Sequence, residues 1–304
     1  MIDEVLKKGN PCIVGLDPRI DQMPAFAVQP NPKDKSEFAQ AVSRSIALYH
    51  HCIIDAVADI VPAVKLQSAF YEQYGMGGML ALEDTVKYAK SRGLIVIIDG
   101  KRNDIAASAQ AYANTFLGKT AAFGSDFSAL DADCLTVSPY LGRDSIEPFV
   151  KACSEYGRGI FVLVKTSNPG SGDIQDLRLQ DGSAIYGRVA GMVNGLAQGT
   201  IGEHGYSSIG AVVGATFPEQ ARAIRSLIPK SIFLVPGYGK QGGSGADVVP
   251  CFNKDGLGAV VNASRSITYD LGPKDMTEEK VSEEIRRRVQ AMASDISIAL
   301  AAAR

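Results

Sequence analysis

Short apolar runs rich in β-branched residues alternate with segments of helical periodicity along the whole chain. Most of these runs are continuously apolar, which is typical of parallel strands covered on both faces. Eight of them are present, at residues 11–17, 61–67, 93–99, 134–139, 159–166, 209–215, 231–237 and 258–264. We therefore predict eight parallel strands with helices between them.

Between the strands, apolar residues recur every three or four positions. The clearest stripe consists of Phe38, Val42, Ile46, Tyr49, Ile53 and Val57. We expect Asn31 to cap this helix, because Pro32 after it suits the first helical position. Residues 216–219, Thr-Phe-Pro-Glu, predict a capping box before another helix. Residues 105–116 and 277–303 predict two further helices, the second of which ends the fold.

Eight strand-then-helix units in 304 residues predict an α/β protein that forms a single (β/α)8 TIM barrel. A Rossmann-like open sheet is the second interpretation. No repeat, low-complexity segment or linker indicates another domain, so we expect residues 1–304 to form one domain. Residues 19–35 and 167–183 exceed normal loop length, and such stretches serve either as binding loops or as surface decoration.

Composition narrows the class of protein. The chain is 46% hydrophobic and 21% charged, with a net charge of −2, so no global field favours nucleic acid or an anionic membrane. Its apolar runs are of strand length, and its first ten residues lack the order of a signal peptide. Five scattered cysteines predict reduced thiols, and three histidines form no metal-ligand pattern. We expect a cytoplasmic protein without a metal site.

Polar or charged residues lie at the carboxyl ends of most predicted strands. This is where barrels of this class carry their active sites. Any one such residue has an ordinary explanation, such as a turn or a lysine that reaches solvent, but so many together favour a site. They are Asp17, Lys65, Gln67, Asp99, Lys101, Thr166, Ser167, Pro236, Gly237 and Arg265.

Residues 99–104, Asp-Gly-Lys-Arg-Asn-Asp, place a lysine between two carboxylates at the end of the third strand. Because side chains alternate along a strand, Asp99 and Lys101 are predicted to share a face. Asp104 follows at the start of the next helix, so the three charges are expected to meet around one point. The spacing alone also fits a solvated loop.

A glycine-rich loop follows the seventh strand, at residues 237–245. Its glycines leave backbone N–H groups open to an anion, and Arg265 after the eighth strand suits bidentate contact with phosphate. Loops after strands seven and eight often build phosphate sites on these barrels. Gly237, Gly239 and Gly242 also match a dinucleotide fingerprint, but six strands precede them, whereas that fingerprint opens a sheet.

Six motifs together resemble the orotidine 5′-phosphate decarboxylase family, and more narrowly its longer-chain subgroup. The motifs run in order from the first strand to the eighth, and no charged motif position is substituted. They are GLDPR at 15–19, VKLQSAFYE at 64–72, DGKRNDI at 99–105, VKTSNPGS at 164–171, PGYGKQGG at 236–243 and NASRSI at 262–267.

The resemblance implies decarboxylation of orotidine 5′-monophosphate to uridine 5′-monophosphate and carbon dioxide, the final step of de novo pyrimidine synthesis. It implies a carboxy-lyase that is a homodimer and uses no cofactor or metal. The implied catalytic array is Lys65, Asp99, Lys101 and Asp104, with Asp104 supplied to the neighbouring subunit. The implied substrate contacts are Asp17 on the ribose, Ser167 or Thr166 on the pyrimidine, Pro236 beside the base, and Gln241, Gly242 and Arg265 on the phosphate.

The chemistry agrees with this mapping. Loss of carbon dioxide from C6 leaves electrons in an orbital outside the ring's π system, so a localised carbanion needs electrostatic stabilisation. Lys101 fits as the adjacent ammonium and as the proton donor, and Asp99 and Asp104 keep it charged. Two alternatives remain. One is a metal-dependent sugar-phosphate decarboxylase or aldolase on the same barrel, and the other is a non-catalytic nucleotide-binding barrel.

Overall fold

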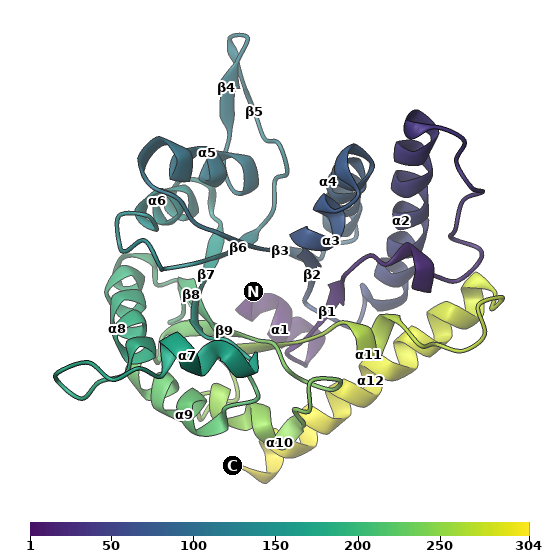
Figure 1. Ribbon diagram of the computed structural model, residues 1–304. Helices are drawn as coiled ribbons and strands as arrows, with labels where there is room; N and C mark the ends of the chain where they lie inside the picture. The colour runs from purple at the N-terminus through teal and green to yellow at the C-terminus, as the bar shows by residue number, and fades with distance from the viewer. Residues whose placement is uncertain (304) are drawn as a thin grey trace. The chain divides into compact units, whose positions relative to one another are not determined.

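Eight parallel strands form a closed barrel in the computed structural model, which describes residues 1–303 (Figure 1). The strands are β1 (Cys12–Leu16), β2 (Ala63–Gln67), β3 (Ile95–Arg102), β6 (Cys134–Val137), β7 (Gly159–Lys165), β8 (Ser207–Val213), β9 (Ser231–Val235) and β10 (Ala259–Ala263). Their order around the barrel is β1-β10-β9-β8-β7-β6-β3-β2. Each lies within or overlaps a predicted strand, so the predicted (β/α)8 fold is confirmed.

Helices lie before the first barrel strand, between successive strands and after the last strand. They are α1 (Ile2–Lys8), α2 (Lys35–Val57), α3 (Ser68–Glu72), α4 (Gly75–Ser91), α5 (Ala106–Phe116), α6 (Glu147–Tyr156), α7 (Gly172–Gln175), α8 (Ile185–Ala197), α9 (Pro218–Leu227), α10 (Gly245–Val248), α11 (Arg265–Thr268) and α12 (Glu278–Ala302). Single 3-10 turns are η1 (Ile20–Gln22), η2 (Pro169–Ser171), η3 (Gln198–Thr200) and η4 (Val249–Cys251). The two helices predicted at residues 105–116 and 277–303 are α5 and α12.

Contacts divide the chain into two compact units. The first comprises residues 3–100 and 263–293, and the second comprises residues 101–262 with the segment that begins at residue 294. In the first unit α2 packs along α4, and in the second α8 packs against β8 and α9. That residues 1–304 act as one domain stays a prediction.

The apolar stripe of α2 faces the core of the first unit. Val42, Ile46, Tyr49, Ile53 and Val57 are buried, whereas Phe38 in the first turn is 45% exposed. The expected cap at Asn31 and Pro32 is wrong. The carboxylate of Asp34 accepts hydrogen bonds from the backbone N–H groups of Ser36 and Glu37, so the helix begins at Lys35.

The expected capping box at residues 216–219 is also wrong. Helix α9 begins at Pro218, with Phe217 as its N-cap and without a side-chain hydrogen bond to the cap. The hydroxyl of Thr216 donates instead to the backbone carbonyl of Ser167, at 3.0 Å. The Thr216 hydroxyl, which the local sequence assigns to a helix cap, therefore holds Ser167 in the segment after β7.

An antiparallel hairpin outside the barrel was not predicted. It consists of β4 (Thr120–Ala122) and β5 (Ser125–Phe127), which pair only with each other and project as a ribbon (Figure 1). Phe123 at its tip has a φ of 53° and is fully exposed. Strands of three residues carry too short a pattern for periodicity to indicate them.

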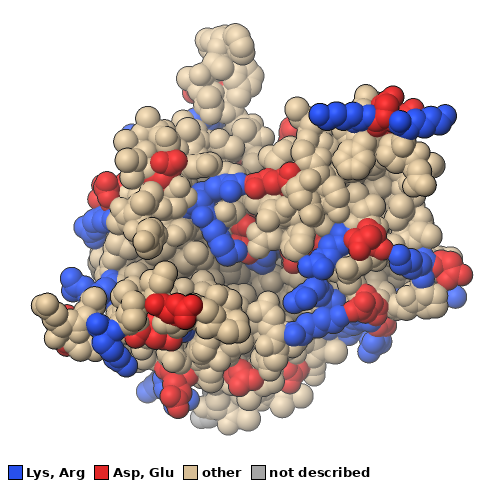
Figure 2. Space-filling model, viewed as in Figure 1, with Lys and Arg blue, Asp and Glu red and all other residues tan. Residues whose placement is uncertain are grey.

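The remaining composition-based expectations concern thiols, histidines and charge. All five cysteines are free, and four of them are buried. Burial lowers the pKa of His50 to about 3, with a further contribution from His51, and the ring nitrogen of His50 contacts the hydroxyl of Tyr71. Acidic and basic side chains are interspersed on the face shown in Figure 2. Across residues 1–303, no helix is long and apolar enough to cross a membrane.

Candidate active site

A buried lysine and two carboxylates meet at the carboxyl ends of β1, β2 and β3. Lys65 Nζ lies 3.1 Å from Asp99 Oδ2 and 4.0 Å from Asp17 Oδ1. Gln67, which is paired with Asp99 across the strands, donates its side-chain N–H to the same Asp99 oxygen at 3.0 Å. The parallel register therefore brings together four of the residues that were singled out as strand-end groups.

Electrostatics keep this lysine charged. Burial opposes the charged form, but the negative charges of Asp99 and Asp17 and the hydrogen bond with Asp99 outweigh it and raise the pKa of Lys65. Asp17 Oδ1 is buried and accepts no hydrogen bond from the described residues. Buried acceptors are nearly always satisfied, so this oxygen is suited to a ligand hydroxyl.

Lys101 lies at the end of β3, in the second unit, with strained backbone. Its φ of 48° falls in the left-handed region, which is uncommon for residues other than glycine. Its backbone N–H donates to Thr136 Oγ1 at 2.9 Å, which ties it to β6. Because the left-handed conformation departs from extended strand geometry, simple alternation does not set the direction of this exposed side chain. Strain of this kind clusters at functional sites.

The segment after Lys101 is held by the side chain of Asn103. Its amide donates to the backbone carbonyl of Ser138 and to the hydroxyl of Ser145. Asp104 follows, half-buried, and accepts a hydrogen bond from the backbone N–H of Ile105, the N-cap of α5. Asn103 was not singled out from the sequence, although it lies inside the charged motif. The shared site predicted for Lys101 and Asp104 stays a prediction.

The candidate base-reading and phosphate-binding segments contact each other in the second unit. Ser167 Oγ donates to Gln241 Oε1 at 2.9 Å. The loop that carries Gln241 turns through Gly237, Gly239 and Gly242, whose φ values of 107°, 75° and 98° suit glycine. Pro236, at the start of this loop, is half-buried, and its carbonyl accepts from Ala215 N–H.

The structure distinguishes Thr166 from Ser167. The hydroxyl of Thr166 donates to the Asn168 side chain at 2.7 Å and accepts from the Gln175 side chain at 2.9 Å. Ser167 makes no such contact with Gln175. Gln175 and the fully buried Lys165 were both missed by sequence analysis. The signal for Lys165 was present, since it ends an otherwise apolar strand in the VKTSNPGS motif.

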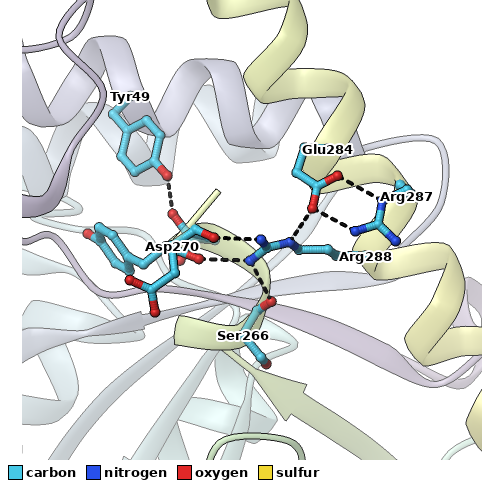
Figure 3. Close-up of polar contacts among 8 residues, drawn as sticks. Tyr49, Ser266, Asp270, Glu284, Arg287 and Arg288 are labelled. Atoms are coloured by element: carbon cyan, nitrogen blue, oxygen red, sulfur yellow. Dashed lines mark hydrogen bonds and ion pairs between the residues drawn. The ribbon is translucent and has the colours of Figure 1, made fainter. Parts of the chain in front are cut away.

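Arg265 is exposed as the first residue of α11, and the turn after it is fastened to α12. The guanidinium of Arg288 donates to the carbonyls of Ser266, Tyr269 and Asp270 at 2.7–3.1 Å (Figure 3). The hydroxyl of Tyr49 on α2 donates to the Thr268 carbonyl. These bonds determine the path of the turn.

The same turn contacts the end of β1. The hydroxyl of Tyr269 donates to the backbone carbonyl of Asp17 at 2.8 Å and accepts from the N–H of Arg19 at 2.9 Å. The backbone around Asp17 and the turn after Arg265 are therefore held by one tyrosine. This links two of the residues that sequence analysis assigned to substrate binding.

Replacing Arg288 with alanine is expected to reduce the free energy of unfolding by about 2 kcal/mol, because three carbonyls lose a charged donor. Urea denaturation measures this loss. Arg287→Ala is the matched control, since Arg287 is 68% exposed and hydrogen-bonds only Glu284 among the described residues (Figure 3). It is expected to change stability by about 0.5 kcal/mol or less. Equal losses from both variants would contradict the role given to the carbonyl contacts.

The fold and these strand-end residues define a (β/α)8-barrel protein with a buried, charged site at the ends of its first three strands. In residues 1–303, no group of three or more histidine, cysteine or acidic side chains is arranged to hold a metal ion. Residues 45–279 match the orotidine 5′-phosphate decarboxylase / HUMPS family. The chain belongs to this family.

Known relatives extend the match over most of the chain. It is 49% identical to an orotidine 5′-phosphate decarboxylase of Rhodopirellula baltica, over 87% of this chain and 85% of that protein. It is 43% identical to one of Caldicellulosiruptor bescii, over 88% of each. Among solved structures, the OMP decarboxylase of Leishmania donovani is 27% identical, with a TM-score of 0.71 and 98% coverage of both chains.

Proposed function

We propose that the protein decarboxylates orotidine 5′-monophosphate to uridine 5′-monophosphate and carbon dioxide. The observation that carries the proposal is the buried Lys65 in contact with Asp99 and Asp17 at the ends of three neighbouring strands. Family membership and relatives named for this activity at 43–49% identity support it. We place the reaction in the cytoplasm.

The reaction requires stabilisation of a carbanion at C6 of the pyrimidine. Its electron pair lies in the ring plane and is not delocalised into the π system, so a fixed positive charge must stabilise it. Lys101 supplies this ammonium in our proposal and delivers the proton that completes the product. Lys65, Asp99 and Asp104 complete an alternating array of charges around it. The array acts without cofactor or metal.

Repulsion between Asp99 and the substrate carboxylate contributes only part of the acceleration. Two like charges ~4 Å apart cost about 4 kcal/mol at an effective dielectric constant of 20. Enzymes typically lower barriers by ~8–23 kcal/mol. Stabilisation of the developing carbanion must therefore supply most of the effect, because it is specific to the transition state.

Substrate binding is assigned to groups at the other strand ends. Asp17, whose buried Oδ1 lacks a donor among the described residues, accepts from a ribose hydroxyl. Ser167 contacts the pyrimidine, which Pro236 lines. Its hydroxyl donates to Gln241, whereas the hydroxyl of Thr166 both donates to Asn168 and accepts from Gln175. Gln241, Gly242 and Arg265 bind the phosphate. Phosphate contacts remote from C6 order the charged array.

We further propose a homodimer of single-domain subunits, in which Asp104 completes the site of the neighbouring subunit. The resemblance to the family supports this assignment, and so does the position of Asp104 at the start of α5, where it is half-buried and accessible at the surface. A subunit would then be catalytically incomplete without its partner.

The absorbance of orotidine 5′-monophosphate, followed with purified protein in the presence and absence of EDTA, tests the proposed function. We expect decay of the signal at the same rate in both. Decay that EDTA abolishes would assign the chain to a metal-dependent reaction. Absence of decay, with protein shown to be folded by circular dichroism and dimeric by light scattering, would overturn the assigned substrate.

A further inference from the structure

The residues after β7 fold back onto the strand end through a buried ion pair. Lys165 Nζ lies 2.8 Å from both carboxylate oxygens of Asp176 and 3.0 Å from Ser171 Oγ. The ammonium also lies 4.3 Å from the centre of the Phe217 ring, and the lysine is fully buried. A helix of four residues such as α7 has little stability of its own, so this ion pair determines its position.

Helix α7 thereby presents Gln175 to the residue beside Ser167. The side-chain carbonyl of Gln175 accepts from the backbone N–H of Thr166 at 3.0 Å, and its N–H donates to the Thr166 hydroxyl at 2.9 Å. One amide thus holds both the backbone and the side chain of Thr166. The hydroxyl of Thr166 uses its only proton on Asn168.

Ser167 is also held by contacts with residues after β8 and β9. Its carbonyl accepts from Thr216 Oγ1, and its hydroxyl donates to Gln241. Gly214, after β8, allows close approach, because a Cβ at that position would lie 2.8 Å from Ser167 Cα. Gln175 supplies the remaining constraint, since it holds the backbone N–H and the hydroxyl of Thr166, the residue before Ser167.

We propose that Gln175 is a positioning residue for pyrimidine recognition, which acts by holding Thr166 so that Ser167 faces the base. This inference rests on the proposed function. It also assigns a function to residues 167–183. The Lys165–Asp176 ion pair positions this segment, and Gln175 within it holds the residue next to Ser167. Orientation of a contact group to within a fraction of an ångström is what binding and catalysis require.

Ligands with and without a base separate this role from general support of the fold. Uridine 5′-monophosphate and ribose 5-phosphate share the phosphate and the sugar, but only the first carries a pyrimidine. In Gln175→Met the chain length is kept and both hydrogen bonds are lost. We expect the inhibition constant of uridine 5′-monophosphate to rise about tenfold and that of ribose 5-phosphate to change less than about twofold.

Gln198→Met is the matched control, because Gln198 is exposed and bonds only Asn194 among the described residues. It is expected to leave both constants unchanged. Unchanged constants in Gln175→Met, or equal increases for the two ligands, would overturn the inference. Gln175→Glu, which keeps an acceptor for the Thr166 N–H, provides the same ligand comparison if the methionine variant does not fold, with a smaller selective increase expected.

The wild-type enzyme separates this inference from the proposed function. Absence of turnover of orotidine 5′-monophosphate by the wild type contradicts the proposed function. Normal wild-type turnover with unselective ligand binding in the Gln175 variants contradicts the positioning role alone. A selective loss with the pyrimidine ligand supports both.

Discussion

Lys101→Ala is expected to lower the turnover number by about 10⁴-fold or more, because it removes both the charge beside the carbanion and the proton donor. Binding of uridine 5′-monophosphate is expected to stay within about tenfold of wild type, since phosphate and ribose contacts are unaffected. Single-turnover kinetics and calorimetric binding measure the two effects. The structural reason to expect so large an effect is the strained backbone of Lys101, whose N–H is bonded to Thr136.

Near-normal turnover in Lys101→Ala would contradict its role. Mixing this variant with inactive Asp104→Ala tests whether the site is shared between subunits. In random hybrids half of the dimers contain one of each, and one of their two sites has both residues intact, so about one quarter of wild-type activity should return. No recovery after subunit exchange, verified by mass spectrometry, would place both residues in the same subunit's site.

Arg265→Ala is expected to lower kcat/KM for orotidine 5′-monophosphate by about 100-fold or more, which corresponds to about 3 kcal/mol, because the phosphate loses a bidentate partner. The effect should fall mainly on KM. Orotidine, which lacks the phosphate, should react equally slowly with wild type and variant. Arg222→Ala, on the exposed face of α9, is the matched control and should behave as wild type. Equal losses for orotidine and its monophosphate would contradict the phosphate assignment.

The fold was predictable because each barrel strand is a short, continuously apolar run. All five residues of β1, β9 and β10 are buried, and this is the pattern that marks parallel strands between two covering layers. The hairpin β4–β5 was not predictable, because five of its six strand residues are exposed and they carry no apolar period. Helix caps were predicted less well. Several residues that can cap a helix lie close together before α2, and the one used is Asp34, which accepts from the N–H groups of Ser36 and Glu37.

The sequence predicted which residues of the candidate site lie at the carboxyl ends of the strands. Parallel strands bring their carboxyl ends to one edge, and the pairing of β1 with β2 and β2 with β3 accounts for the cluster of Asp17, Lys65 and Asp99. Its charges were visible because lysine and aspartate rarely end apolar strands without a partner. The distances between them required the register of the sheet.

The sequence pattern alone therefore predicted the eight strands, and it identified the polar and charged residues at their carboxyl ends. Choices between neighbouring residues required tertiary contacts. Thr166 and Ser167 are equivalent in pattern, but Gln175, nine residues after Thr166, occupies only the first of them. The physical reason is that periodicity reports which residues are covered, whereas hydrogen-bond partners depend on which segments the folded chain brings within 3 Å of each other.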